Sequence, residues 1–146
     1  MVGQRHGMYS TNPDTAWAID STMEYAEDCF AAMSKKNKTA PGGEFQAEDL
    51  ANIMELHTKM CEMIERRLSM HGKKFIAGTN DVTVGDIKLS HMFYNNVYNE
   101  ALGLSDDQRN QLKANIAKYK KAEQYIDVTM RQVLANYLKT RPPCPA

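Results

Sequence analysis

Cysteine is scarce in this sequence. The three cysteines, Cys29, Cys61 and Cys144, are odd in number and too scattered to form a disulfide framework. Small secreted domains that depend on disulfides are much richer in cysteine. We therefore expect a reducing compartment, with the cytoplasm as the default location.

Neither sign of charge is in surplus. Eighteen Lys and Arg residues balance 18 Asp and Glu residues. Nucleic acid and anionic membranes attract proteins that carry a surplus of positive charge, so neither is expected as a partner. Short basic runs at 35–38 and 118–121 are typical of solvated helix surface.

Long apolar runs are also missing. No stretch approaches the ~20 apolar residues of a membrane span, and no apolar segment follows Met1 to Gly7 as it would in a signal peptide. These absences predict a soluble protein. At 146 residues the chain can bury a core of its own without disulfides or metals, so we expect a single domain over residues 1–146.

The familiar motifs of catalytic and phosphate-binding sites do not occur. There is no GxGxxG and no Walker loop, and no Ser or Cys has a base at a recognisable spacing. His57 and Cys61, four residues apart on one helix face, could offer two metal ligands. Without a second ligand pair, a core-edge histidine beside a buried cysteine is favoured, and no metal is expected. His91 is likewise interpreted as a hydrogen-bonded core histidine rather than a ligand or base.

Helical patterns are abundant instead. Asn12-Pro13-Asp14 starts a helix that runs to about Ser34, and a second helix over 47–70 is ended by Gly72. Two further helices are predicted over 105–119, with Ser105 to Gln108 as a capping box, and over 126–139. The apolar stripe of the first helix consists of Ala16, Ile19, Met23, Ala26, Phe30 and Met33.

The most specific local signal is the segment from Val82 to Ile87. Thr83 can cap a helix, and Asp86 three residues later can return a bond to the Thr83 N–H, which is the capping-box arrangement. Val82 and Ile87 can pack together as a hydrophobic staple. The helix that follows, to about Tyr98, is apolar on most of its circumference, which is typical of a buried core helix. The predicted fold is all-α, a bundle of about five helices.

This segment also carries a family resemblance. The stretch from Lys74 to Ile87 closely resembles the glutathione S-transferase signature, in which an aromatic-aliphatic-Ala-Gly loop leads into the cap and staple of the central helix of the C-terminal domain. Arg5 to Tyr9, followed by Ala18-Ile19-Asp20, looks like the interdomain linker and first helix of that domain, with residues 1–11 as the linker. Tyr137 to Pro142 looks like the chain end of sigma- and mu-like members. The resemblance covers essentially the whole chain and implies the helical C-terminal domain of that family.

The resemblance implies a domain without its catalytic partner. Family members begin with a thioredoxin-like domain that binds glutathione and activates its thiol, and nothing in this sequence matches it. The chain alone is therefore not expected to be a competent transferase, and glutathione would be a co-substrate only after joining to such a domain. Two residues of the central helix, Gly85 and Lys88, depart from the family pattern and mildly weaken the helix.

Few site residues are implied by the resemblance. Asp28 matches a family aspartate that reaches the γ-glutamyl amine of glutathione across the dimer; the alternative is a solvated acid next to Glu27. Phe30, Ala31 and Ser34 fall where the family lines its pocket for hydrophobic electrophiles, although Phe30 fits a core position equally well.

Two functions remain open from the sequence. The first is the C-terminal half of a glutathione transferase, which supplies the pocket wall and dimer contacts. The second is a helical module of the same family that binds a partner without chemistry. In either case the face that the thioredoxin-like domain would cover is expected to be apolar, which predicts a homodimer or a partner protein.

Overall fold

The computed structural model describes residues 6–37, 45–98 and 104–140; the side chains of residues 33–37 and 96 lie outside this description. Within these ranges every regular element is a helix and there is no strand, so the predicted all-α fold is confirmed. None of the described helices combines the length and the hydropathy of a bilayer-crossing segment. In chain order the elements are α2 (Pro13–Asn37), α3 (Ala47–His71), α4 (Val84–Asn96), α5 (Asp106–Ile116), α6 (Lys120–Gln124), the π-helix η1 (Tyr125–Met130), α7 (Arg131–Val133) and α8 (Ala135–Thr140).

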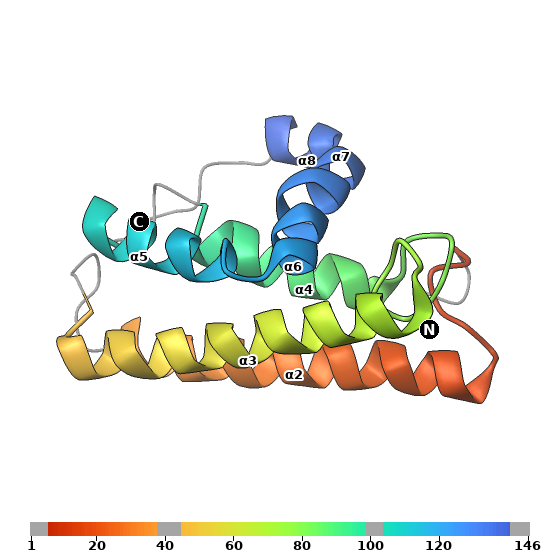
Figure 1. The fold of residues 1–146 in the computed structure, drawn as a ribbon, viewed down its shortest axis with the longest axis horizontal. Helices are drawn as coiled ribbons and strands as arrows, with labels where there is room; N and C mark the ends of the chain where they lie inside the picture. The colour runs from red at the N-terminus through yellow and green to blue at the C-terminus, as the bar shows by residue number, and fades with distance from the viewer. Residues whose placement is uncertain (1–5, 38–44, 99–103, 141–146) are drawn as a thin grey trace.

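The long helices α2 and α3 run antiparallel, side by side, and form one layer of the domain (Figure 1). At the start of α2, Asn12 Oδ1 accepts the backbone N–H groups of Asp14 and Thr15 at 3.0 and 3.1 Å. At the end of α3, Gly72 has a φ of 61° and its N–H donates to the Leu68 carbonyl oxygen at 3.1 Å. Both boundaries are as predicted, because each is made by groups close together in the sequence.

An arginine fixes α3 relative to α2. Nη1 of Arg67 donates to the Ala18 carbonyl oxygen at 2.8 Å and to Thr22 Oγ1 at 2.5 Å. Nη2 of the same guanidinium donates to Ser21 Oγ at 2.8 Å. Charge-assisted bonds from one rigid group to a single turn of α2 set the alignment of the two helices.

The buried face of α2 differs from the predicted stripe. Ile19 and Ala26 are buried as expected, but Phe30 is 37 % exposed. Thr22 and Cys29 are buried instead, and Met33 lies outside the described side chains. The stripe is rotated because α2 packs against both α3 and α4, so contacts with two neighbours decide which residues are covered.

The helix α4 is a core helix, as predicted. It packs against α2 and η1, and Leu89, Met92, Phe93 and Val97 are all buried. Gly85 allows the close approach of α4 to α2, since a Cβ at this position would lie 3.2 Å from the Ile19 carbonyl oxygen. Gly85 weakens the helix, but because it has no side chain, α4 can lie close to α2 at this point.

The start of α5 is only half of the predicted capping box. Ser105 Oγ accepts the Gln108 N–H at 3.3 Å, as expected. The Gln108 side chain does not return to Ser105: its Oε1 accepts the Phe45 N–H at 3.3 Å and its Nε2 donates to the Phe45 carbonyl oxygen at 2.8 Å. Gln108, which belongs to α5, therefore holds the segment that precedes α3 against α5. The helix ends at Ile116, three residues before the predicted end.

The C-terminal helical run starts earlier than predicted. It begins at Lys120 rather than at Ile126, because Glu65 of α3 accepts the backbone N–H groups of Lys121 and Ala122 at 2.8 and 3.1 Å. A π-helix follows, in which the Ile126 carbonyl oxygen accepts the hydroxyl of Tyr94 from α4. Figure 1 shows this run, α6 to α8, leaving the layer of long helices at a steep angle.

Candidate functional site

The start of α4 has the predicted capping box. Thr83 has an extended backbone, and its Oγ1 accepts the Asp86 N–H at 3.4 Å. Asp86 Oδ2 accepts the Thr83 N–H at 2.8 Å and the Thr83 hydroxyl at 2.6 Å. Val82 packs against the core cluster and Ile87 is half-buried, while their packing together as a staple stays a prediction.

Asp86 does more than close the cap. Its second oxygen, Oδ1, accepts the Ile76 N–H at 2.9 Å and the Tyr125 hydroxyl at 2.6 Å. Burial and the neighbouring Asp86 carboxylate raise the pKa of Tyr125 well above its ordinary value. One buried carboxylate therefore joins the 72–83 loop, α4 and η1, which is a structural role rather than a catalytic one.

The site residues implied by the resemblance lie on α2. Asp28 and Ala31 are exposed, and the side chain of Ser34 lies outside the described residues. Phe30 lies beside α4, with the Lys88 Nζ 5.9 Å from the centre of its ring. Glu27, one turn before it, has Oε2 2.5 Å from the same Nζ. The structure therefore brings Phe30 to Lys88, one of the two departures from the family pattern.

A pocket lies between α4 and the C-terminal run, and the sequence interpretation missed it. Its volume is about 560 Å³, within the range of small-molecule sites. The sequence contains a signal for this pocket. The predicted core helix is apolar on most of its circumference and residues 134–138 are largely apolar, so both surfaces would be expected to pack against another apolar group. The pocket is lined by Val84, Ile87, Lys88, His91, Tyr94, Asn95, Leu134, Tyr137 and Leu138.

The polar groups of this pocket are few. Lys88 and His91 are half-buried, and Asn95 Nδ2 lies 2.9 Å from His91 Nε2. The Tyr94 hydroxyl is bound to the Ile126 carbonyl oxygen, so this residue offers the pocket mainly its ring. An apolar wall with a small number of polar groups is typical of a site for a hydrophobic molecule.

His57 and Cys61 lie in the core of the domain. Both are buried, and the edge of the His57 ring packs on Phe93 with the ring centres 5.4 Å apart. Neither ring nitrogen of His57 has a hydrogen-bond partner, and burial lowers the pKa of His57 to about 4. Across the described ranges no cluster of three or more His, Cys, Asp or Glu is placed to hold a metal.

The two described cysteines are poor nucleophiles. Burial raises the pKa of the Cys29 thiol to about 11 and that of Cys61 to about 12. A thiol with so high a pKa holds almost no thiolate at neutral pH. Neither residue is therefore a candidate for thiol catalysis.

Comparisons of this chain with models of protein families, with curated proteins and with solved structures found no match. The described residues form an all-α domain with an apolar pocket beside its core helix.

Proposed function

We propose that this chain is a helical domain of the glutathione S-transferase C-terminal type that holds hydrophobic molecules and has no transferase activity by itself. The observation that carries the proposal is the pocket of about 560 Å³ along α4, next to Phe30 and Lys88. The capping box at Thr83 and Asp86 supports it, because it starts the helix that forms one wall of this pocket. Glutathione chemistry would require a second domain that activates the thiol.

Reducing surroundings are part of the proposal. Cys29 and Cys61 are free and buried, as they would be in the cytoplasm. We propose the cytoplasm as its location.

Binding of an aryl halide tests the proposal directly. We expect 1-chloro-2,4-dinitrobenzene to bind the chain in calorimetry without any glutathione conjugate being formed. Leu134→Trp should abolish binding by filling the pocket, since Leu134 lines it. Val133→Trp is the matched control, because Val133, the residue before Leu134, is 37 % exposed and does not line the pocket.

Three results would contradict this proposal. They are absence of binding to the wild-type chain, equal effects of the two tryptophan variants, and conjugation of glutathione by the chain alone. Retention of the chain on immobilised glutathione would likewise contradict a domain that needs a partner to bind this tripeptide.

A second candidate function, an interaction module that associates with another protein chain, is favoured by the outer face of α2 and α3. Trp17 and Met70 are 68 % and 78 % exposed, more than any other large apolar side chain described, and both line the same groove. Arg66 and Arg67 line it too, and the guanidinium of Arg67 lies 5.7 Å from the Trp17 ring centre. Trp, Met and Arg are enriched at protein interfaces.

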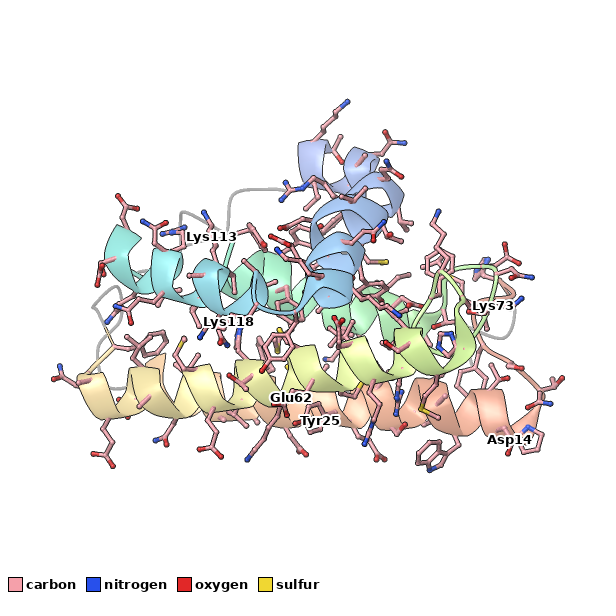
Figure 2. All side chains as sticks on the ribbon, in the orientation of Figure 1. Asp14, Tyr25, Glu62, Lys73, Lys113 and Lys118 are labelled. Atoms are coloured by element: carbon pink, nitrogen blue, oxygen red, sulfur yellow. The ribbon has the colours of Figure 1, made fainter. Side chains whose placement is uncertain are left out.

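This face extends along the two helices. A second groove shares Trp17 and both arginines and continues past Tyr25 and Glu62, which Figure 2 shows on adjacent turns of α2 and α3. We propose that the face forms a homodimer or binds a partner protein. Sedimentation of the chain should show self-association that Trp17→Glu removes, whereas Val128→Glu on η1 should not. A wild-type chain that stays monomeric at all concentrations would contradict the homodimer.

A further inference from the structure

The pocket between α4 and α8 has an uneven charge. Among the described residues that line it there is one lysine, Lys88, and no Asp or Glu. Among the described lining residues, His91 is the other one that can gain a positive charge, and it lies one helical turn after Lys88 on α4. The remaining described side chains that line it are apolar, aromatic or amide, so the described lining offers a charged molecule a cation and no anion.

Lys88 lines the pocket together with Val84 and Ile87, and its side chain is 35 % exposed. The ammonium reaches out to Glu27 of α2, where Nζ and Oε2 are 2.5 Å apart, and to the ring of Phe30. An ammonium has three donors, so an ion pair with one carboxylate leaves capacity for a second acceptor.

Glu27 is a competitor for this lysine rather than part of the pocket. Its side chain is 58 % exposed, and it does not line the cavity. An exposed ion pair of this kind contributes little to stability, so it can exchange partners at small cost. A carboxylate that enters with an apolar chain would gain the same contact and also bury its chain.

We propose that the pocket takes a hydrophobic monoanion, such as a medium-chain fatty acid, with its chain along α4 and α8 and its carboxylate on the Lys88 ammonium. This inference rests on the proposed function, because it names the class of ligand for the same pocket. It assigns Lys88, whose charge is unexpected on a core helix, as the residue that selects the headgroup.

The test compares two probes with the same chain and different headgroups. Decanoate and decanamide are titrated into the full chain by calorimetry at low salt. Lys88→Gln should lower the affinity for decanoate by about tenfold, because one partly exposed charge-assisted hydrogen bond is lost. The affinity for decanamide should be unchanged. Lys88→Arg keeps the charge and should retain most of the affinity for decanoate.

Glu27→Gln gives the opposite result on the same pair of probes. Without the competing carboxylate, decanoate should bind about two- to fivefold more tightly, because exposed ion pairs are weak, while decanamide is unaffected. Raising the salt concentration should weaken decanoate alone. Lys118→Gln is the control, since this exposed lysine after α5, labelled in Figure 2, does not line the pocket.

The outcomes separate this inference from the proposed function. If both probes bind equally well to wild type and Lys88→Gln leaves decanoate unchanged, the anion selectivity is wrong and the apolar pocket stands. If neither probe binds, or if Leu134→Trp changes neither, the pocket is not a ligand site and the proposed function fails with the inference. Unchanged melting temperatures of the variants show that the effects are not losses of fold.

Discussion

Two buried polar side chains, Asp86 at the start of α4 and His57 in the middle of α3, differ in how many hydrogen bonds they make. The Asp86 carboxylate accepts four hydrogen bonds, two from backbone N–H groups and two from hydroxyls. His57 is equally inaccessible, yet neither of its nitrogens has a partner. A buried group with full partners holds separate elements together, whereas one without partners is tolerated only while it is uncharged.

The largest effect is expected at Asp86. Asp86→Asn keeps the shape of the side chain but replaces one carboxylate oxygen by an NH2 group, which faces hydrogen-bond donors. Two or more hydrogen bonds are therefore lost, and buried donors are left without acceptors. We expect the free energy of unfolding in urea to fall by about 3 kcal/mol or more. Asp81→Asn, an exposed acid in the same loop, should cost less than about 0.5 kcal/mol. Equal costs would mean that the Asp86 network does not stabilise the domain.

The next effect concerns His57 and acid. Its pKa is about 4 in the folded chain, against an ordinary value of 6.5, so between these values the unfolded chain binds a proton that the folded chain does not. Folding is therefore not penalised by ionisation of His57 above pH 6.5, and the free energy of unfolding falls as the pH drops from 6.5 toward 4. The loss should be on the order of 3 kcal/mol.

A leucine at position 57 isolates this contribution. His57→Leu has a similar volume and no ionisable group, so its stability should be equal or slightly higher at pH 7 and should fall less steeply toward pH 4. Urea unfolding of both proteins across this pH range measures the difference. Parallel curves for the two proteins would show that His57 is hydrated or paired in solution.

Removing one partner of Asp86 is a smaller change. Tyr125→Phe deletes the hydroxyl that donates to Oδ1 and leaves the Ile76 N–H in place. We expect a loss of about 1–2 kcal/mol, as for one hydrogen bond to a charged group. Tyr119→Phe is the matched control, because its hydroxyl donates to exposed Glu62 at 3.3 Å and should be worth only a few tenths. In the Asp86→Asn background the Tyr125 effect should shrink, since both residues belong to one network.

The smallest effect is expected at Gly85. Alanine favours a helix by about 1 kcal/mol over glycine, but here its Cβ would press on the Ile19 carbonyl oxygen. We expect Gly85→Ala to change stability by less than about 0.5 kcal/mol, with Ala51→Gly on the exposed face of α3 losing the full propensity difference. A full gain on Gly85→Ala would mean that α2 and α4 are not in close contact at this point.

The sequence predicted the features that depend on near neighbours. The boundaries at Asn12 and Gly72 and the Thr83–Asp86 box involve groups two to four residues apart, so their residue types are enough to identify them. The helical period over 47–70 also predicts one apolar stripe, made of Leu50, Ile53, Met54, His57, Met60, Cys61, Ile64 and Leu68. Six of these residues are buried in α3, and Leu50 and Met54 are half-buried.

The features that were missed depend on distant partners. Gln108 binds Phe45, and Glu65 caps α6, across 63 and up to 57 residues of sequence. The π-helix accompanies the bond from Tyr94 to Ile126, which no helical periodicity reveals. The same holds for the pocket. Phe30 was identified as a possible wall, but Lys88 and Leu134, which are far apart in the sequence, line one cavity only in the folded domain.

Two further hydrogen bonds tie the N-terminal segment to the helices of the domain. The backbone N–H of Val84, the first residue of α4, donates to the Met8 carbonyl oxygen at 2.9 Å, and the Tyr9 hydroxyl donates to Asp20 at 2.6 Å. A pulling force applied at the N-terminal segment would therefore reach the first turn of α4 through the bond at Met8 and would reach α2 through the bond at Tyr9. Any molecule that pulls or twists residues 6–9 acts directly on the first turn of α4, whose Val84 is also a wall of the pocket.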